Sequence, residues 1–136
     1  MHAPGATYPD GMQLKMCSIH VTDPASAHEF YTGKLGFETL VAMPEGMLYV
    51  VNAPGQDVGL LLEPSDPEIA EPYRAAVYER GLPAIVFDSA DLDADIARLR
   101  EAGVSVVGDV MEDPSGRAVL VDDEHGNYIQ LHESLS

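Results

Sequence analysis

Polar side chains that can do acid–base chemistry or bind a metal fall on one face of several short predicted strands. Side chains alternate along an extended segment, so Ser18 and His20 share a face of a strand near residues 14–22. The same alternation assigns further polar residues to the mixed faces of three later strands: Glu63, Asp88, Tyr128, Gln130 and His132. We treat these residues as the candidate ligand-binding set.

Three interpretations of this set stay open. His20, Glu63, Asp88 and His132 are a possible ligand set for zinc, manganese or iron. Alternatively, His20 or His132 acts as a general base beside a carboxylate, because an imidazole titrates near neutral pH. In the third interpretation, which we favour, these groups hydrogen-bond one another or water in a wet cleft.

The elements that would position these residues are short and occur twice. A strand over residues 14–22 is followed by Asp23 and Pro24, a typical helix start, and the helix ends at Gly36. Short apolar runs at 37–42, 46–51 and 57–63 predict three more strands. Residues 14–63 therefore have the order βαβββ.

The second half of the chain repeats this order. It predicts a strand at 83–89, a helix from Asp91 to Gly103, and strands at 104–107, 117–121 and 127–132. The spacing between matching residues indicates an internal repeat of about 70 residues. We predict an α+β fold of one structural domain, with an N-terminal arm (1–12), two βαβββ modules (13–64 and 83–134) and a connector helix (65–82). One helix covers only one face of each sheet, so the two sheets should together enclose a cleft.

Composition excludes several classes of function. The chain has 136 residues and a formal net charge of −16, which disfavours binding to nucleic acids and to anionic membranes. No apolar run is long enough to cross a bilayer. A single cysteine, Cys17, and an N-terminus without a signal-peptide pattern predict a cytoplasmic protein.

The chain resembles the vicinal oxygen chelate superfamily, which includes glyoxalases, bleomycin-resistance proteins and extradiol dioxygenases. The resemblance rests on HVTD (20–23), FYTGKLGF (30–37), ADLD (90–93), LREAGV (99–104), PSGR (114–117), DDEHGN (122–127) and IQLHE (129–133). It implies paired βαβββ modules and commonly a homodimer. Members catalyse unrelated reactions or none, so the fold alone does not assign an activity.

Metal-dependent members of this superfamily have four ligands, usually His and Glu, on the first and last strands of both modules. The resemblance assigns three of these positions to Met16, Ala84 and Gln130. The fourth position has three candidates on one strand face: Gly59, Leu61 and Glu63. A thioether, a methyl group and an amide are poor ligands for a divalent cation, so we expect no metal at this site and no metal-dependent activity.

We therefore predict a metal-free homodimer without a cofactor that binds a small organic ligand in the cleft between its modules. Tyr49 and Tyr128 are the only candidate aromatic walls, which disfavours a large planar antibiotic. The alternative is a glyoxalase-like lyase or isomerase that uses His20 or His132 with Glu63 as acid and base, with or without a displaced divalent metal. A third possibility is an interaction module with a vestigial cleft.

Overall fold

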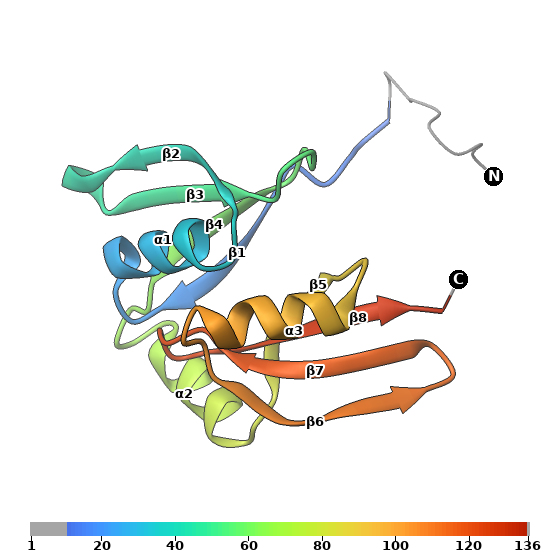
Figure 1. Ribbon diagram of the computed structural model, residues 1–136. Coiled ribbons are helices and arrows are strands. Elements are labelled where there is room, and N and C mark those ends of the chain that lie inside the picture. Colours follow the sequence, from blue (N-terminus) through green and yellow to red (C-terminus); the bar gives the residue numbers. More distant parts are fainter. Residues whose placement is uncertain (1–10, 136) are drawn as a thin grey trace.

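The computed structural model describes residues 11–135 and contains two βαβββ modules joined by a helix (Figure 1). Residues 1–10 of the predicted N-terminal arm lie outside this description. The first module contains β1 (Met16–Val21), α1 (Pro24–Gly33), β2 (Glu38–Met43), η1 (Pro44–Gly46), β3 (Leu48–Asn52) and β4 (Gly59–Pro64). Its sheet, called sheet A, has the order β1-β4-β3-β2, with β1 parallel to β4.

The second module repeats this topology. It contains β5 (Pro83–Asp88), α3 (Leu92–Glu101), β6 (Val106–Asp113), β7 (Gly116–Asp122) and β8 (Tyr128–Ser134). Sheet B has the order β5-β8-β7-β6, with β5 parallel to β8. The connector contains α2 (Glu71–Glu79). The predicted α+β fold of two tandem modules is confirmed, although the two sheets do not form a closed barrel.

The helix starts follow the sequence signals. The Asp23 side chain accepts a hydrogen bond from the backbone N–H of Ser26, and Pro24 begins α1. In the second module, the side chain of Asp91 accepts from the N–H of Ala94 at the start of α3. These caps satisfy backbone donors that have no partner within the helix.

Most strand ends differ from the predicted ranges by one or two residues, but one strand is much longer than predicted. We expected a strand over residues 104–107, whereas β6 runs from Val106 to Asp113. Gly108 lies within it with φ of +75°, and the pairing with β7 shifts register between Val107 and Met111. The glycine produces an irregularity inside the strand rather than its end, because a residue without Cβ adopts positive φ without steric cost.

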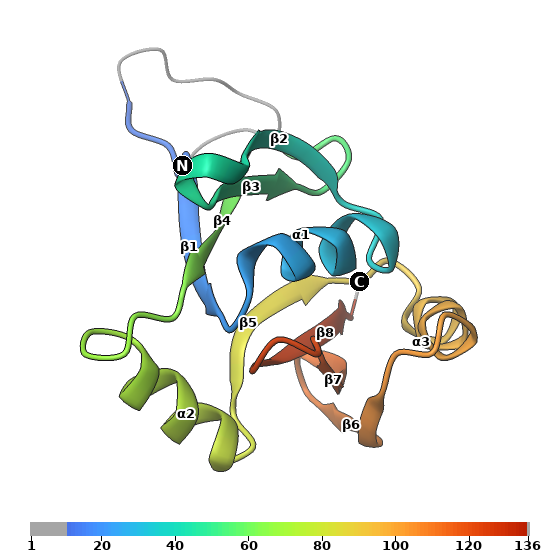
Figure 2. The same cartoon turned by 90° about the vertical axis from the view of Figure 1, so that its left-hand side faces the viewer.

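A single buried core connects the modules. Figure 2 shows α1 lying between sheet A and strands β5 and β8. Tyr31 of α1 contacts both Phe37 and Phe87 edge-on, with ring centroids 6.1 and 6.5 Å apart. The thiol of Cys17 packs against this core, as its strand parity predicts.

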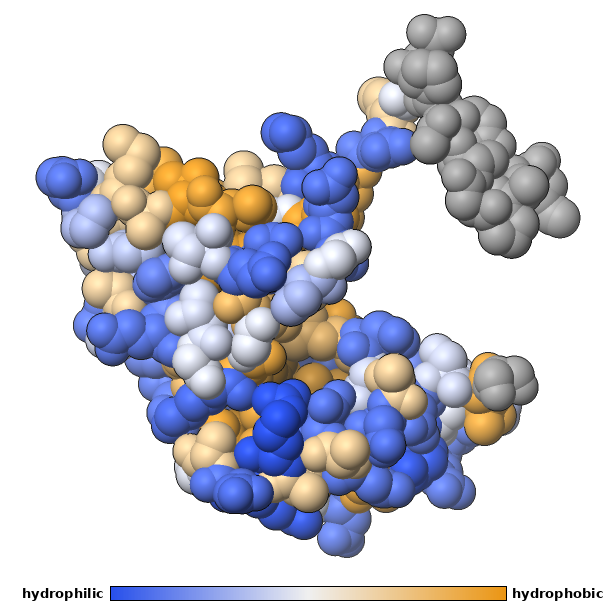
Figure 3. Space-filling view, turned by 45° about the horizontal axis from the view of Figure 1, so that its top comes forward, coloured by the Kyte–Doolittle hydropathy of each residue, from blue (hydrophilic) through white to orange (hydrophobic). Residues whose placement is uncertain are grey.

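The face of each sheet opposite α1 or α3 is called the open face, and α2 covers only the part of it near β1, β5 and Tyr128. Apolar side chains remain exposed there, including Met16 (47%) on sheet A and Val86 (55%) and Met111 (69%) on sheet B. Hydrophobic residues gather over the first module in Figure 3. Between residues 11 and 135, every helix is too short or too polar to span a bilayer.

Candidate ligand-binding site

A histidine and a carboxylate meet on the open face of sheet A. His20 of β1 and Glu63 of β4 are partners in the parallel ladder, so their side chains leave the sheet on the same side. Their Nε2 and Oε2 atoms are 3.2 Å apart, and both side chains are partly exposed. This pair can move a proton or orient a polar group of a ligand.

The corresponding pair of sheet B is arranged differently. Asp88 of β5 and His132 of β8 are also ladder partners. However, Nε2 of His132 lies 3.0 Å from Oγ of Ser115, which in turn donates a hydrogen bond to Asp113. Within residues 11–135, no group of three or more His, Cys, Asp or Glu side chains is placed to hold a metal ion. The predicted set of His20, Glu63, Asp88 and His132 therefore lies as two pairs, one on each sheet.

A small pocket lies where β1, β5 and α2 meet. It has a volume of about 120 Å³ and is lined by Ser18 and His20 of β1, Ala84 of β5, and Tyr73 and Val77 of α2, among others. The structure thus brings two of the predicted residues, Ser18 and His20, into one pocket between the modules. The contribution of α2 was missed, because sequence periodicity shows a helix but not what it covers.

A larger pocket lies on the open face of sheet A and measures about 380 Å³. Met16, Leu40, Val50 and Gly59 belong to its apolar part, and Lys15, Asn52, Gln56 and Asp57 complete its lining. A Cβ atom at Gly59 would lie 3.0 Å from a methyl group of Val50 and 3.6 Å from Met16, so the missing side chain keeps this space open. Our search for polar residues missed this pocket, although a glycine within a strand pattern is a signal of close approach.

The remaining candidates on sheet B are Tyr128, which contacts α2, and Gln130, which is partly exposed. The ring of Tyr128 stacks on Tyr78 of α2, with centroids 4.5 Å apart and an interplanar angle of 13°. The Tyr78 hydroxyl donates a 2.6 Å hydrogen bond to Asp122, and this bond raises the pKa of Tyr78. Gln130 is partly exposed and lies opposite Val86 in the ladder. One face of Tyr128 is therefore covered by α2.

A buried carboxylate of the second module holds the strand that carries His20. Asp123 accepts hydrogen bonds from the Tyr31 hydroxyl, from the backbone N–H groups of His125 and Asn127, and from Nδ2 of Asn127. Burial raises the pKa values of both Asp123 and Tyr31. Nδ2 of Asn127 also donates to the backbone carbonyl of His20 at 2.8 Å. The sequence predicted only a hairpin turn here, since contacts across 92 residues leave no local pattern.

The strand register identifies the fourth position of the expected metal site. The ladder pair Val86–Gln130 lies two residues before Asp88–His132, and Ser18–Leu61 lies two residues before His20–Glu63. Leu61 is therefore the equivalent of Gln130. With this register, the resemblance places the four positions of the expected metal site at Met16, Leu61, Ala84 and Gln130. A thioether, two alkyl groups and an amide do not fit a divalent cation.

The sequence as a whole assigns the family. Residues 13–131 match the Glyoxalase/Bleomycin resistance protein/Dioxygenase superfamily. The chain belongs to this superfamily. A curated relative is the uncharacterized protein YurT of Bacillus subtilis (strain 168), 36% identical over 124 residues that cover 88% of this chain and 98% of YurT.

Two solved structures of proteins from Streptomyces sp. CB03234 are similar to this chain. TnmS3, described as an antibiotic binding protein, is 29% identical with a TM-score of 0.76, covering 94% of this chain and all of TnmS3 (100%). A glyoxalase/bleomycin resistance protein is 31% identical with a TM-score of 0.69, covering 88% of this chain and 99% of that protein. These matches confirm the resemblance found in the sequence motifs.

Proposed function

We propose that this protein binds a small, largely apolar organic molecule on the open face of sheet A. The observation that carries this proposal is the pocket of about 380 Å³ that Gly59 leaves open beside Met16, Leu40 and Val50. Its size and lining suit a small ligand rather than a large one. The description of TnmS3 as an antibiotic binding protein supports a binding role for this superfamily member.

A second copy of the chain completes the proposed site. The open faces expose methionine and branched aliphatic side chains on both sheets, which a single chain leaves in contact with water. In a homodimer, the open face of one copy covers that of the other and removes the ligand from solvent. Sedimentation at several protein concentrations measures this association.

The proposed binding requires no metal. The residues at the four expected ligand positions offer no suitable donor set, so orientation of the ligand falls to polar groups that line the pocket, such as Lys15, Asn52 and Gln56. The net charge of −16 favours neutral or cationic ligands over anionic ones at this site.

A ligand screen with matched variants tests the proposal. A panel of neutral and cationic apolar compounds is tested by thermal shift and calorimetry in the presence of EDTA. Gly59→Val fills the pocket and should weaken binding by about tenfold or more, since a branched side chain there overlaps ligand space. Gly33→Ala is the control, because a Cβ at Gly33 has nothing within 4 Å.

Two outcomes of the screen would contradict the proposed pocket. If no compound raises the melting temperature, or if Gly59→Val and the control behave alike, the proposed pocket is wrong. Leu40→Asn is a second test in case Gly59→Val destabilises the sheet, because Leu40 is 55% exposed and its substitution leaves the core intact. This variant should also weaken binding.

The His20–Glu63 contact of 3.2 Å favours one second function, an acid–base lyase or isomerase of the glyoxalase-like class. In this function His20 takes a proton from the substrate and Glu63 stabilises the resulting imidazolium. Hemithioacetals are suitable test substrates, assayed with metal-free protein and after addition of zinc, nickel or manganese. Turnover that is lost in His20→Asn and Glu63→Gln supports the enzyme. Absence of turnover in all these conditions contradicts it.

A further inference from the structure

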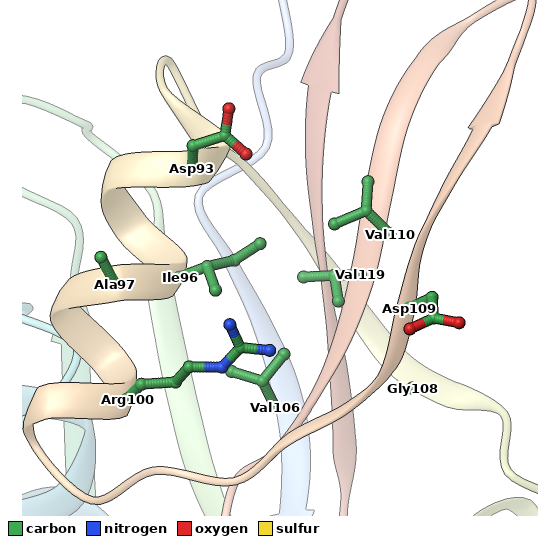
Figure 4. A pocket seen from close by; sticks show the side chains of 9 residues that line it. All are labelled: Asp93, Ile96, Ala97, Arg100, Val106, Gly108, Asp109, Val110 and Val119. Carbon is green, nitrogen blue, oxygen red and sulfur yellow. The ribbon is translucent and has the colours of Figure 1, made fainter.

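A groove separates α3 from β6 on the helix-covered side of sheet B (Figure 4). It has a volume of about 320 Å³. Ile96 of α3, Val106 and Val110 of β6, and Val119 of β7 form its apolar surface. This groove lies on the opposite side of sheet B from the open face, so it is separate from the ligand site proposed above.

A positively charged side chain without an ionic partner lies in this groove. The chain has only seven Lys and Arg residues against 23 Asp and Glu residues, so most of its arginines have carboxylate partners. Arg74, Arg98 and Arg117 all form ion pairs with Asp or Glu. Within residues 11–135, Arg100 forms none, and Figure 4 shows its side chain extending from the end of α3 toward β6 and Val106.

Negative charges flank the groove at other points. Asp109 of β6 lines it, and Asp93 at the start of α3 is held by the Arg117 guanidinium at 2.9 Å. This ion pair lowers the pKa of Asp93, which therefore stays ionised. A second anionic group on a ligand would meet these carboxylates.

We infer that the groove between α3 and β6 binds a small monocarboxylic acid with a short apolar body. The ligand carboxylate pairs with the planar guanidinium of Arg100, which suits two parallel hydrogen bonds. The body of the ligand covers the isoleucine and valine side chains. The volume of about 320 Å³ is at the lower end of small-molecule sites, so the ligand is small. Asp93 and Asp109 select against dicarboxylates.

The test uses amide spectra of the isotope-labelled full chain at constant pH and ionic strength. Sodium 4-methylpentanoate and benzoate are titrated to about 10 mM, which detects millimolar dissociation constants, and glutarate and chloride serve as comparison anions. We expect saturable shifts at Ile96, Gly108 and Val119. Glutarate should bind at least about fivefold more weakly, because of repulsion by the two carboxylates.

Two variants and one control separate a real site from general anion binding. Arg100→Gln should weaken binding about tenfold, as expected for loss of a charge-assisted pair. Arg80→Gln should leave it unchanged, because Arg80 also lacks an ion pair within residues 11–135 but lies at the end of α2, outside the groove. Ala97→Phe fills the groove from an exposed helix position and should abolish binding without removing the charge.

Several results would overturn the inference. These are the absence of shifts with both acids, equal shifts with chloride, equal weakening by Arg80→Gln, or shifts confined to the open faces. Groove shifts that depend on protein concentration in the absence of acid would assign the groove to a second copy of the chain instead.

Discussion

The two modules carry the same pair of chemical groups at equivalent positions, but only one pair is in contact. In sheet A the histidine is on the first strand and the carboxylate on the last, and His20 and Glu63 lie 3.2 Å apart. In sheet B the order is reversed, and His132 contacts Ser115 at 3.0 Å, while Asp88 is exposed. Strand register makes side chains neighbours, whereas a competing hydrogen-bond partner decides which contact forms.

The competing partner comes from a turn that the first module lacks. Ser115 lies between β6 and β7 and is fixed by bonds from its hydroxyl and its backbone N–H to Asp113. The equivalent connection of the first module is η1 (Pro44–Gly46), which has no hydroxyl side chain. His20 and Glu63 therefore contact each other directly, whereas Asp88 and His132 do not, and this difference between the modules can be tested.

The largest expected effect on stability comes from removing the hydrogen bonds of Asp123, whose turn contacts the strand that carries His20. Asp123→Asn replaces an acceptor of four hydrogen bonds with a group that cannot accept them all. We expect the free energy of unfolding to fall by about 1–3 kcal/mol, measured by urea denaturation. Glu124→Gln is the control, because that exposed neighbour should change stability by no more than about 0.5 kcal/mol. Equal losses in both variants would show that Asp123 has no special role.

The buried carboxyl group of Asp123 should also affect how the stability of the folded protein depends on pH. Burial raises the pKa of Asp123 above 3.8, so the folded state binds this proton more tightly than the unfolded state does. Its contribution to stability is therefore greatest at low pH and falls as the pH rises from 3.8 through the raised pKa. Denaturation of wild type and Asp123→Asn at several pH values measures this difference. A difference that grows with rising pH in favour of wild type would contradict it.

Smaller effects are expected on the imidazole resonances, which should distinguish the His20–Glu63 pair from the His132–Ser115 pair. Ser115→Ala removes the hydroxyl partner of His132, and we expect the imidazole resonances of His132 to move while those of His20 stay in place. Glu63→Gln should do the reverse. Both are surface changes, so unfolding free energies should shift by less than about 0.5 kcal/mol. Movement of both histidines in either variant would show that the pairs are coupled.

The smallest effect on stability concerns the partly buried ion pair between Glu71 and Arg74 of α2, whose arginine lines the pocket that contains His20. Hydrogen bonds from Arg74 and Ser65 lower the pKa of Glu71 from 4.5 to about 2. The stabilisation from this pair is present above pH 4.5 and is lost as the pH falls toward 2. Arg74→Gln should remove part of this acid sensitivity in denaturation curves. An unchanged curve would show that solvent screens the pair completely.

Local features of the fold could be predicted because they have local sequence signals. Asp23 and Asp91 begin helices, Cys17 has the parity of a core residue, and the repeat of strands and helices gives two modules. The alternation of polar residues also assigned His20 and Glu63 to one face, and the parallel register makes them partners.

Contacts between distant segments could not be predicted in this way. The hydrogen bond between Ser115 and His132 depends on the conformation of the β6–β7 turn. The hydrogen bond between Tyr31 and Asp123 joins residues of different modules. The apolar pocket beside Gly59 depends on the packing of four strands, which periodicity does not describe. The alternation of side chains along a strand predicts the sheet face on which a residue lies. The residue that it contacts on that face depends on tertiary packing.

The bond between Tyr31 and Asp123 makes each half of the chain depend on the other. Each half repeats the other in outline, yet a phenol from the first now satisfies a carboxylate enclosed by the second. A fragment ending in the connector would leave one of these groups without its counterpart. The two halves are therefore not interchangeable, because each supplies one member of this buried pair.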